Sequence, residues 1–212
     1  MRIAVVLFPR LTALDAIGPY EVLQRLPDTT VTFVGHRRGE VRSENGFLGL
    51  SVDRAFDEIT DPDVVVVPGG IGTRALLTDD VLLDWLRTAH AGSRFTTSVC
   101  TGSLLLAAAG LLDGLTATTH WGAMETLAEL GAIPTPVRVV EHLDRRIVTS
   151  AGVSAGLDMA LRLAELLTDE VTAKAMQLML EYDPQPPFDA GSPEKAGPVV
   201  MARARELSLA RA

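Results

Sequence analysis

The sequence has a single cysteine, few aromatic residues and no long hydrophobic or basic run. One cysteine excludes an intrachain disulfide framework and fits a reducing compartment, so we expect a cytoplasmic protein. A net charge of −8 without a basic stripe argues against nucleic acid as a partner. The apolar start of the chain, residues 1–10, is too short for a signal or membrane segment, so we expect no membrane association.

Metal and nucleotide motifs are missing as well. His36, His90 and His142 have no cysteine or histidine at metal-ligand spacing, which predicts no metal site. Gly69–Gly72 follows an apolar run, but it matches neither the Walker pattern nor G-x-G-x-x-G. We therefore expect no cofactor.

What is present is an alternation of apolar strands with amphipathic helices. The expected strands are Ile3–Phe8, Thr30–Gly35, Asp63–Val67, Phe95–Val99 and Leu115–His120, followed by a strand pair at Val137–Glu141 and Arg146–Thr149. Asn45–Gly46 predicts a hairpin within Val41–Ser51. The expected helices are Asp15–Leu26, Asp79–Ala91, Leu104–Leu112, Trp121–Leu130, Ser154–Leu167 and Asp169–Tyr182. This order predicts an α/β fold with a doubly wound, flavodoxin-like and mostly parallel sheet flanked by helices.

The chain shows no domain linker before residue 183. We expect residues 1–182 to form one α/β domain. Residues 183–198 are too rich in proline and glycine for helix or sheet, and Val199–Leu209 is expected to form a short last helix. Residues 183–212 would then be an arm that belongs to the same domain or to a dimer interface.

The only cysteine stands at a strand-to-helix turn. The strand Phe95–Val99 leads into Cys100, and small residues then precede an apolar helix. Unpaired N–H groups and the dipole at a helix N-terminus favour a thiolate, so this position predicts a lowered pKa for the thiol. The arrangement follows the logic of a nucleophile elbow, although G-x-S-x-G is absent.

Two other features fall at the carboxyl ends of predicted strands, where ligands of such sheets bind. Asp15 follows the first strand, and Gly69–Gly72 follows another. Asp15 taken alone is more simply explained as a helix cap, and a lone cysteine is commonly inert core. Their convergence favours a catalytic site. His120 ends the next expected strand, where it could act as a base for Cys100 or as a structural residue.

Several motifs together resemble one superfamily. V-C-T-G-S-L-L-L-A-A-A-G-L-L, P-G-G-x-G, L-D-x-x-G-P-x-E-V-L, T-T-H-W and G-V-S-A-G-x-D are similar to the DJ-1/PfpI superfamily, and within it to isocyanide hydratases. The tail E-Y-D-P-Q-P-P-F-D-A-G-S-P extends the resemblance over nearly the whole chain. Sensor domains of AraC-type regulators share much of this pattern.

The resemblance implies hydration of a small apolar isocyanide to an N-substituted formamide through a covalent thioimidate. Cys100 would be the nucleophile and Asp15 the proton shuttle, with a hydroxyl contribution from Thr101. The N–H groups of Gly70 and Thr101 would form an anion hole. A pocket lined by Tyr20, His120, Trp121 and Val153 and a homodimer are further implications.

The same resemblance also separates this chain from two other branches. PfpI-type proteases carry histidine directly after the cysteine, where this chain has Thr101. DJ-1-type glyoxalases place glutamate at the first-helix position that contacts sulfur; here that candidate is Asp15, and we expect Glu21 to be structural. The alternatives to a hydratase are a non-catalytic ligand sensor, a redox sensor in which Cys100 oxidises, and a glyoxalase-like activity.

Overall fold

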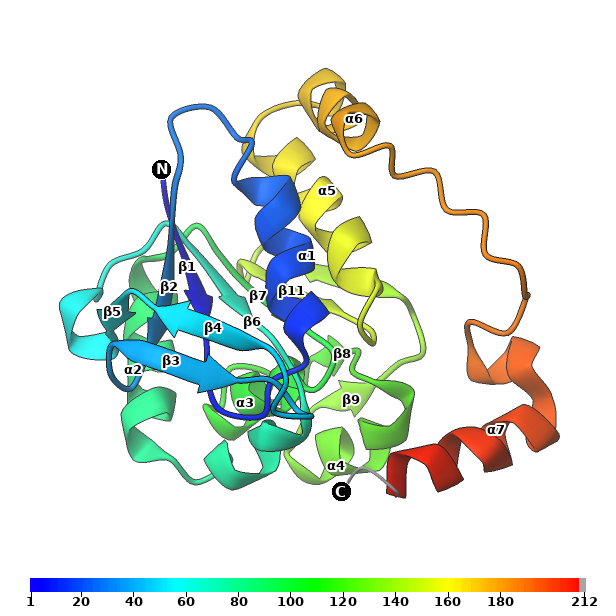
Figure 1. Cartoon of the computed structure of the whole chain (residues 1–212). Helices are drawn as coiled ribbons and strands as arrows, with labels where there is room; N and C mark the ends of the chain where they lie inside the picture. The colour runs from blue at the N-terminus through cyan, green and yellow to red at the C-terminus, as the bar shows by residue number, and fades with distance from the viewer. Residues whose placement is uncertain (210–212) are drawn as a thin grey trace.

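The centre of the molecule is a seven-stranded sheet in a computed structural model that describes residues 1–209 (Figure 1). The strand order is β10-β11-β7-β6-β1-β2-β5, and every neighbouring pair is parallel except β10 with β11. The strands are β1 (Arg2–Val6), β2 (Thr30–Gly35), β5 (Arg54–Ala55), β6 (Val64–Val67), β7 (Phe95–Val99), β10 (Val139–His142) and β11 (Ile147–Ser150). The expected doubly wound, mostly parallel sheet is confirmed.

The middle of this sheet is apolar because both of its faces are covered. All four valines of β6 are fully buried, as are the side chains at Ala4 to Val6 of β1. Continuous apolar runs of this kind are typical of parallel strands between two helical layers. The carboxyl ends of β1, β6 and β7, which are adjacent in the sheet, therefore open onto one common edge.

Two helical layers flank the sheet. On one face α1 (Ala13–Leu23) packs against α5 (Ala155–Leu167), and α6 (Glu170–Met179) packs on α5. On the other face lie α2 (Asp80–Gly92), α3 (Gly102–Ala108) and α4 (Met124–Glu129) (Figure 1). The loops that connect β1 to α1 and β7 to α3 meet at the sheet edge described above.

Two small sheets lie outside the central one. The antiparallel strands β3 (Gly39–Arg42) and β4 (Gly49–Val52) form the hairpin that Asn45–Gly46 predicts, with Gly46 at φ 76°. The expected strand Leu115–His120 is shorter than predicted. Only β8 (Thr116–Ala117) is extended there, and it pairs with β9 (Ile133–Pro134) rather than with the central sheet. The expected helix Trp121–Leu130 begins as a 3-10 turn, Trp121–Ala123, before α4.

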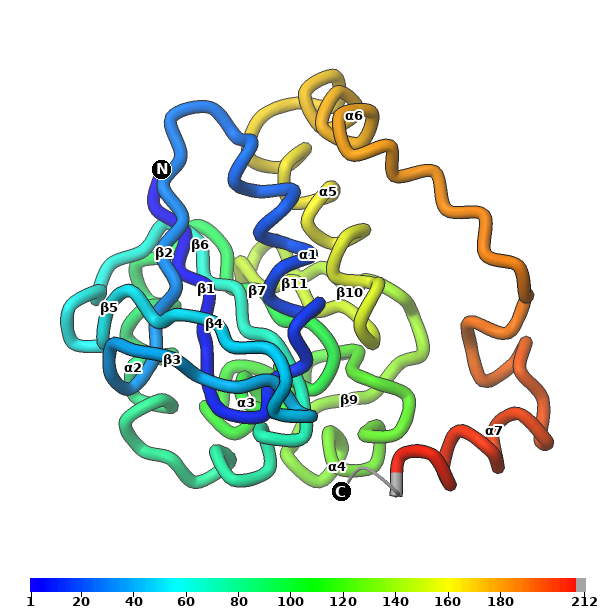
Figure 2. The backbone as a smooth tube through the Cα atoms, viewed as in Figure 1, coloured from blue at the N-terminus to red at the C-terminus, as the bar shows by residue number. Residues whose placement is uncertain are grey.

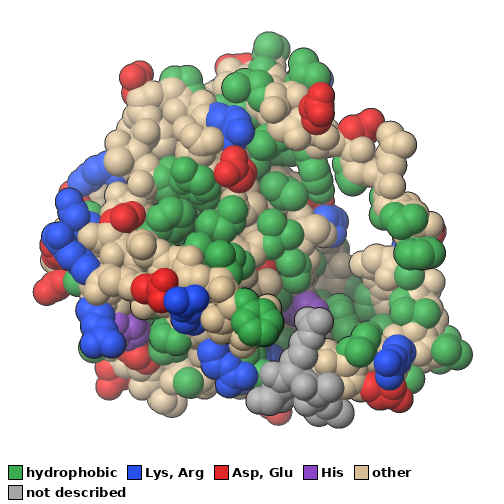
Figure 3. All heavy atoms as spheres, in the orientation of Figure 1, with side chains coloured by type: hydrophobic (Ala, Val, Ile, Leu, Met, Phe, Trp, Pro, Cys, Tyr) green, Lys and Arg blue, Asp and Glu red, His purple; other side chains and the backbone are tan. Residues whose placement is uncertain are grey.

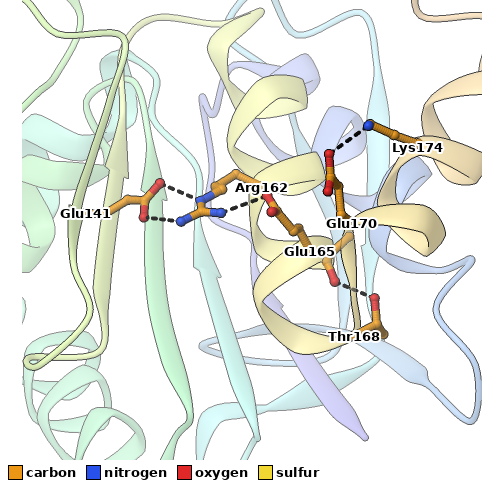
Figure 4. Close-up of polar contacts among 7 residues, drawn as sticks. Glu141, Arg162, Glu165, Thr168, Glu170 and Lys174 are labelled. Carbon is orange, nitrogen blue, oxygen red and sulfur yellow. Dashed lines mark hydrogen bonds and ion pairs between the residues drawn. The ribbon is translucent and has the colours of Figure 1, made fainter.

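An ion-pair group fastens the antiparallel edge strand to the helical layer. Arg162 of α5 binds both carboxylate oxygens of Glu141 in β10, at 2.8 and 3.0 Å, and also Glu165 at 2.7 Å (Figure 4). A two-bond arginine–carboxylate contact fixes orientation as well as distance. Lys174 and Glu170 form a separate pair within α6.

The C-terminal segment leaves the body after α6 and follows a long path outside it (Figure 2). Residues 183–192 form neither helix nor strand, as predicted, but α7 (Pro193–Leu209) begins earlier than expected and is kinked at Gly197. We call residues 183–209 the arm. Figure 3 shows an opening between the arm and the helices of the body. None of the helices within residues 1–209 is long and apolar enough to span a membrane.

Candidate active site

Cys100 occupies the turn between β7 and α3 with a backbone that is strained and firmly held. Its φ is 57°, a left-handed value that non-glycine residues adopt at a cost of about 1–3 kcal/mol. Its N–H lies 3.1 Å from the carbonyl oxygens of both Ser150 and Ala151. Its carbonyl accepts from the hydroxyls of Ser103, at 3.2 Å, and Thr119, at 3.0 Å. Four partners thus fix the main chain that carries the thiol.

Asp15 lies in the first turn of α1 and is fully buried. Its Oδ2 accepts from the Gly69 N–H at 3.0 Å, and its Oδ1 has no hydrogen-bond partner among the described residues. Burial raises the pKa of Asp15 to about 7, against smaller lowering contributions from the Gly69 N–H and the Cys100 thiol. The Glu44 charge raises it further. Asp15 therefore both gains and loses its proton near neutral pH.

The thiol differs from its sequence-based prediction. Its pKa is raised, chiefly by burial and secondly by the charge of Asp15, and only 4% of Cys100 is exposed. The N–H groups of Thr101 and Val153 lower the pKa of the thiol without reversing this balance. The prediction of a lowered pKa was wrong because the dipole of a seven-residue helix is weaker than removal of the charge from water.

The glycine-rich loop packs directly onto the cysteine turn. A Cβ at Gly69 would lie 2.4 Å from the Thr101 nitrogen and 2.9 Å from the Cys100 Cβ. The Gly70 N–H donates to Thr101 Oγ1 at 2.9 Å, and that hydroxyl donates to the Gly70 carbonyl at 3.1 Å. Thr101 thus locks the loop to the turn, whereas we expected the Gly70 N–H to be directed at a substrate.

The predicted pocket residues are not all brought together. Of these residues, Val153 acts on the thiol, since its N–H lowers the pKa of Cys100. His120 contacts Gly152, because a Cβ built there would lie 2.7 Å from its Cδ2, and Trp121 lies beside it at 5.1 Å between ring centres. Tyr20 packs on Phe33 of β2, a strand that is separated from β7 by β6 and β1.

Three contributors to the site were missed at the sequence level. The Gly69 N–H donates to Asp15, the Val153 N–H lowers the pKa of the Cys100 thiol, and the Thr119 hydroxyl donates to the Cys100 carbonyl. Two of these act through main-chain N–H groups, which every residue but proline possesses. The only local signal was glycine, at Gly69 itself and at Gly152 before Val153.

The remaining histidines have structural partners. His36 contacts Asp79 at 2.8 Å, His90 contacts Thr96 at 2.9 Å, and His142 contacts the Thr116 carbonyl at 2.7 Å. Over residues 1–209, no group of three or more histidine, cysteine, aspartate or glutamate side chains could hold a metal ion. Glu21, expected to be structural, pairs with Arg25 at 3.0 Å.

The sheet and the thiol–carboxyl pair at its carboxyl edge define a flavodoxin-like α/β protein with a buried cysteine beside a titratable carboxyl. Residues 1–166 match the DJ-1/PfpI family model, and the chain belongs to that family.

Individual relatives are more specific. The chain is 46% identical to the "Isonitrile hydratase" of Pseudomonas putida over 97% of its own length and 89% of that protein. A solved THiJ/PfpI family protein from Pseudomonas syringae is 40% identical, with a TM-score of 0.92 over 97% of this chain and 85% of that one. The chain is also 32% identical to the HTH-type transcriptional regulator CdhR of Pseudomonas aeruginosa, over 59% of this chain and 37% of the regulator.

Proposed function

We propose that the protein is an isocyanide hydratase, a hydro-lyase that converts R–N≡C and water into R–NH–CHO. The observation that carries this proposal is the buried pairing of Cys100 with Asp15, whose pKa is about 7. The 46% identity to an isonitrile hydratase over nearly the full chain supports the choice of substrate class.

In the first step the Cys100 sulfur attacks the terminal carbon of the isocyanide. Because the thiol is protonated at neutral pH, its proton passes to the Asp15 carboxylate as the C–S bond forms. Asp15 then gives this proton to the same carbon, which yields the thioimidate R–N=CH–S–Cys. No proton is gained from or lost to solvent in this step.

In the second step water adds to the thioimidate carbon, with Asp15 as the base. The resulting tetrahedral species collapses with cleavage of the C–S bond. One proton of the water ends on nitrogen and the other on sulfur, so the thiol is regenerated. The N–H groups of Thr101 and Val153 lower the pKa of the thiol, so they would stabilise negative charge on the sulfur while this bond breaks. The Gly70 N–H would join an anion hole only on release from Thr101 Oγ1.

Burial of the sulfur suits the shape of this substrate. Cys100 is only 4% exposed, so a bulky electrophile would have to displace surrounding residues to reach it. The reactive carbon of an isocyanide is the end of a linear, uncharged group and needs only a narrow opening. Trp121 and the side chain of Val153 would line that opening.

Hydration of an aryl isocyanide by the purified protein tests the reaction and its nucleophile together. We expect formamide absorbance to appear with the wild type and turnover to fall by more than about a thousandfold in Cys100→Ala. Thr88→Ala, a change on the exposed surface of α2, is the matched control. Mass spectrometry of acid-quenched wild-type enzyme should show Cys100 carrying the whole mass of the isocyanide. Full activity of a folded Cys100→Ala would disprove covalent catalysis.

A ligand sensor is the second candidate, favoured by the similarity to the regulator CdhR. A sensor would bind an isocyanide or another small molecule and release it unchanged. Saturable binding by calorimetry without formation of formamide, in a protein whose thiol still reacts with iodoacetamide, would replace the hydratase proposal by this one.

We further propose that the active form is a homodimer and that the arm contacts the second copy. Arm residues 184–191 make no main-chain hydrogen bond to the described body, and Phe188 is 78% exposed. A chain held away from its own body loses conformational entropy without gaining contacts, which a partner in the opening would supply. Light scattering should give twice the chain mass of 22.6 kDa, and Phe188→Ser should weaken the association.

A further inference from the structure

His120 is held on two sides by main chain. Its Nδ1 accepts from the Gly122 N–H at 3.2 Å, which caps the 3-10 turn Trp121–Ala123. Its ring also packs against the backbone of Gly152, where an added Cβ would approach Cδ2 to 2.7 Å. Real Cβ atoms do not come this close, so position 152 accepts only glycine while the ring stays in place.

The loop that carries Gly152 and Val153 contacts the cysteine turn, because the Ala151 carbonyl accepts from the Cys100 N–H at 3.1 Å. Val153 has a φ of 44°, a left-handed value that is costly for a β-branched side chain. Such a conformation persists only where the surroundings enforce it. The Ala151 N–H is bound to the Arg138 carbonyl at 2.9 Å, and the Val153 carbonyl accepts from the Gly156 N–H at 3.3 Å. The Gly152–Val153 peptide lies between these two anchors, and His120 is the side chain seated against it.

We propose that His120 is a positioning residue: its ring, fixed by Gly122 and seated on Gly152, holds the Gly152–Val153 peptide in place beside the Cys100 turn. His120 thus acts on the nucleophile through the main chain of the neighbouring loop and not as its base. This role does not rest on the proposed function, because thiol reactivity can be measured without an isocyanide.

The hydrogen bonding of the ring supports this role over that of a base. Because Nδ1 accepts a hydrogen bond from Gly122, the neutral ring carries its own proton on Nε2, and Nδ1 has no lone pair left for the thiol. Burial, helped by the charge of Arg74 and opposed by that of Glu44, lowers the pKa of His120 below its ordinary value. The ring is therefore neutral at pH 7, the state in which it can accept from Gly122.

His120→Asn separates the two contacts, because asparagine still offers a capping oxygen to Gly122 but has no ring to seat on Gly152. We expect the amide proton of Val153 to move upfield in the NMR spectrum and iodoacetamide to alkylate Cys100 about threefold to tenfold more slowly at pH 8. The turnover number kcat should fall by a similar factor with KM little changed. His142→Asn is the matched control, since His142 binds the Thr116 carbonyl in another part of the molecule.

Gly152→Ala tests the same contact from the other side and keeps the proposal falsifiable if His120→Asn folds poorly. Its new methyl group must displace the ring, so alkylation should slow to the same extent, and the double variant should be no slower than either single one. Additive effects would overturn the proposal. So would a folded His120→Asn with an unchanged Val153 amide and alkylation rate. A hundredfold loss of kcat with unchanged alkylation would instead make His120 an acid–base residue.

Discussion

The Cys100 turn and the arm differ in how many hydrogen bonds hold the main chain of each residue. At the turn, the N–H and carbonyl of a single residue meet four protein partners, and a glycine of the next loop lies within van der Waals contact. Along arm residues 184–191, the described hydrogen bonds are side-chain contacts within the arm itself. At Cys100 a strained and reactive residue is thus held at both main-chain polar groups, whereas the arm lacks such bonds and carries none of the proposed chemistry.

Removing the charge of Asp15 should have the largest effect on stability. With its pKa raised from 3.8 to about 7, the folded state holds a proton that the unfolded state has lost, so wild-type stability falls as pH rises between these values. The amide introduced by Asp15→Asn does not titrate. The free energy of unfolding of this variant relative to wild type should therefore grow from pH 4 to pH 8 by up to about 4 kcal/mol.

Urea unfolding at several pH values measures this difference, and Asp84→Asn, an exposed carboxyl paired with Arg87, is the control. A difference that is constant over the whole range would mean that Asp15 titrates normally.

Crowding the contact between the glycine loop and the cysteine turn should change the free energy of unfolding somewhat less. In Gly69→Ala the added Cβ meets the Thr101 nitrogen at 2.4 Å, and neither strand nor turn can retreat. We expect a loss of about 3 kcal/mol in the free energy of unfolding, the upper part of the range for overpacked sites, together with slower alkylation of Cys100. A change below about 0.5 kcal/mol, the level of an ordinary surface substitution, would show that the turn is more yielding than its bonds suggest.

A glycine-to-alanine substitution in the arm should leave the free energy of unfolding almost unchanged. A Cβ at Gly191 meets no atom within 4 Å, so Gly191→Ala should change the free energy of unfolding by no more than about 0.5 kcal/mol. Urea denaturation monitored by tryptophan fluorescence compares the two glycine variants directly. A large loss in Gly191→Ala would mean that residue 191 itself lies within the proposed contact with the second copy, and the loss should then depend on protein concentration.

The sequence predicted the central sheet well where the residue types of a segment are compatible with only one environment. Four consecutive valines, as in β6, are typical of a strand that is buried on both faces. The turn that carries Cys100 was also predicted at the correct residue. The predicted strand Leu115–His120 was too long because its threonines favour extended structure, whereas only Thr116–Ala117 finds a partner, Ile133–Pro134, which is distant in the sequence. The direction of the thiol pKa failed for a related reason: burial depends on everything packed around Cys100, whereas the helix N-terminus is visible locally.

Asp15 and Cys100 reach each other from separate crossovers, one following β1 and the other following β7, with β6 between these strands. The loop after β6 touches both residues through Gly69. Asp15 and Cys100 are therefore presented by two independent segments that follow different strands of one sheet. Either residue can be exchanged without rebuilding the segment that presents the other, which makes position 15 the natural place to retune the chemistry of this thiol.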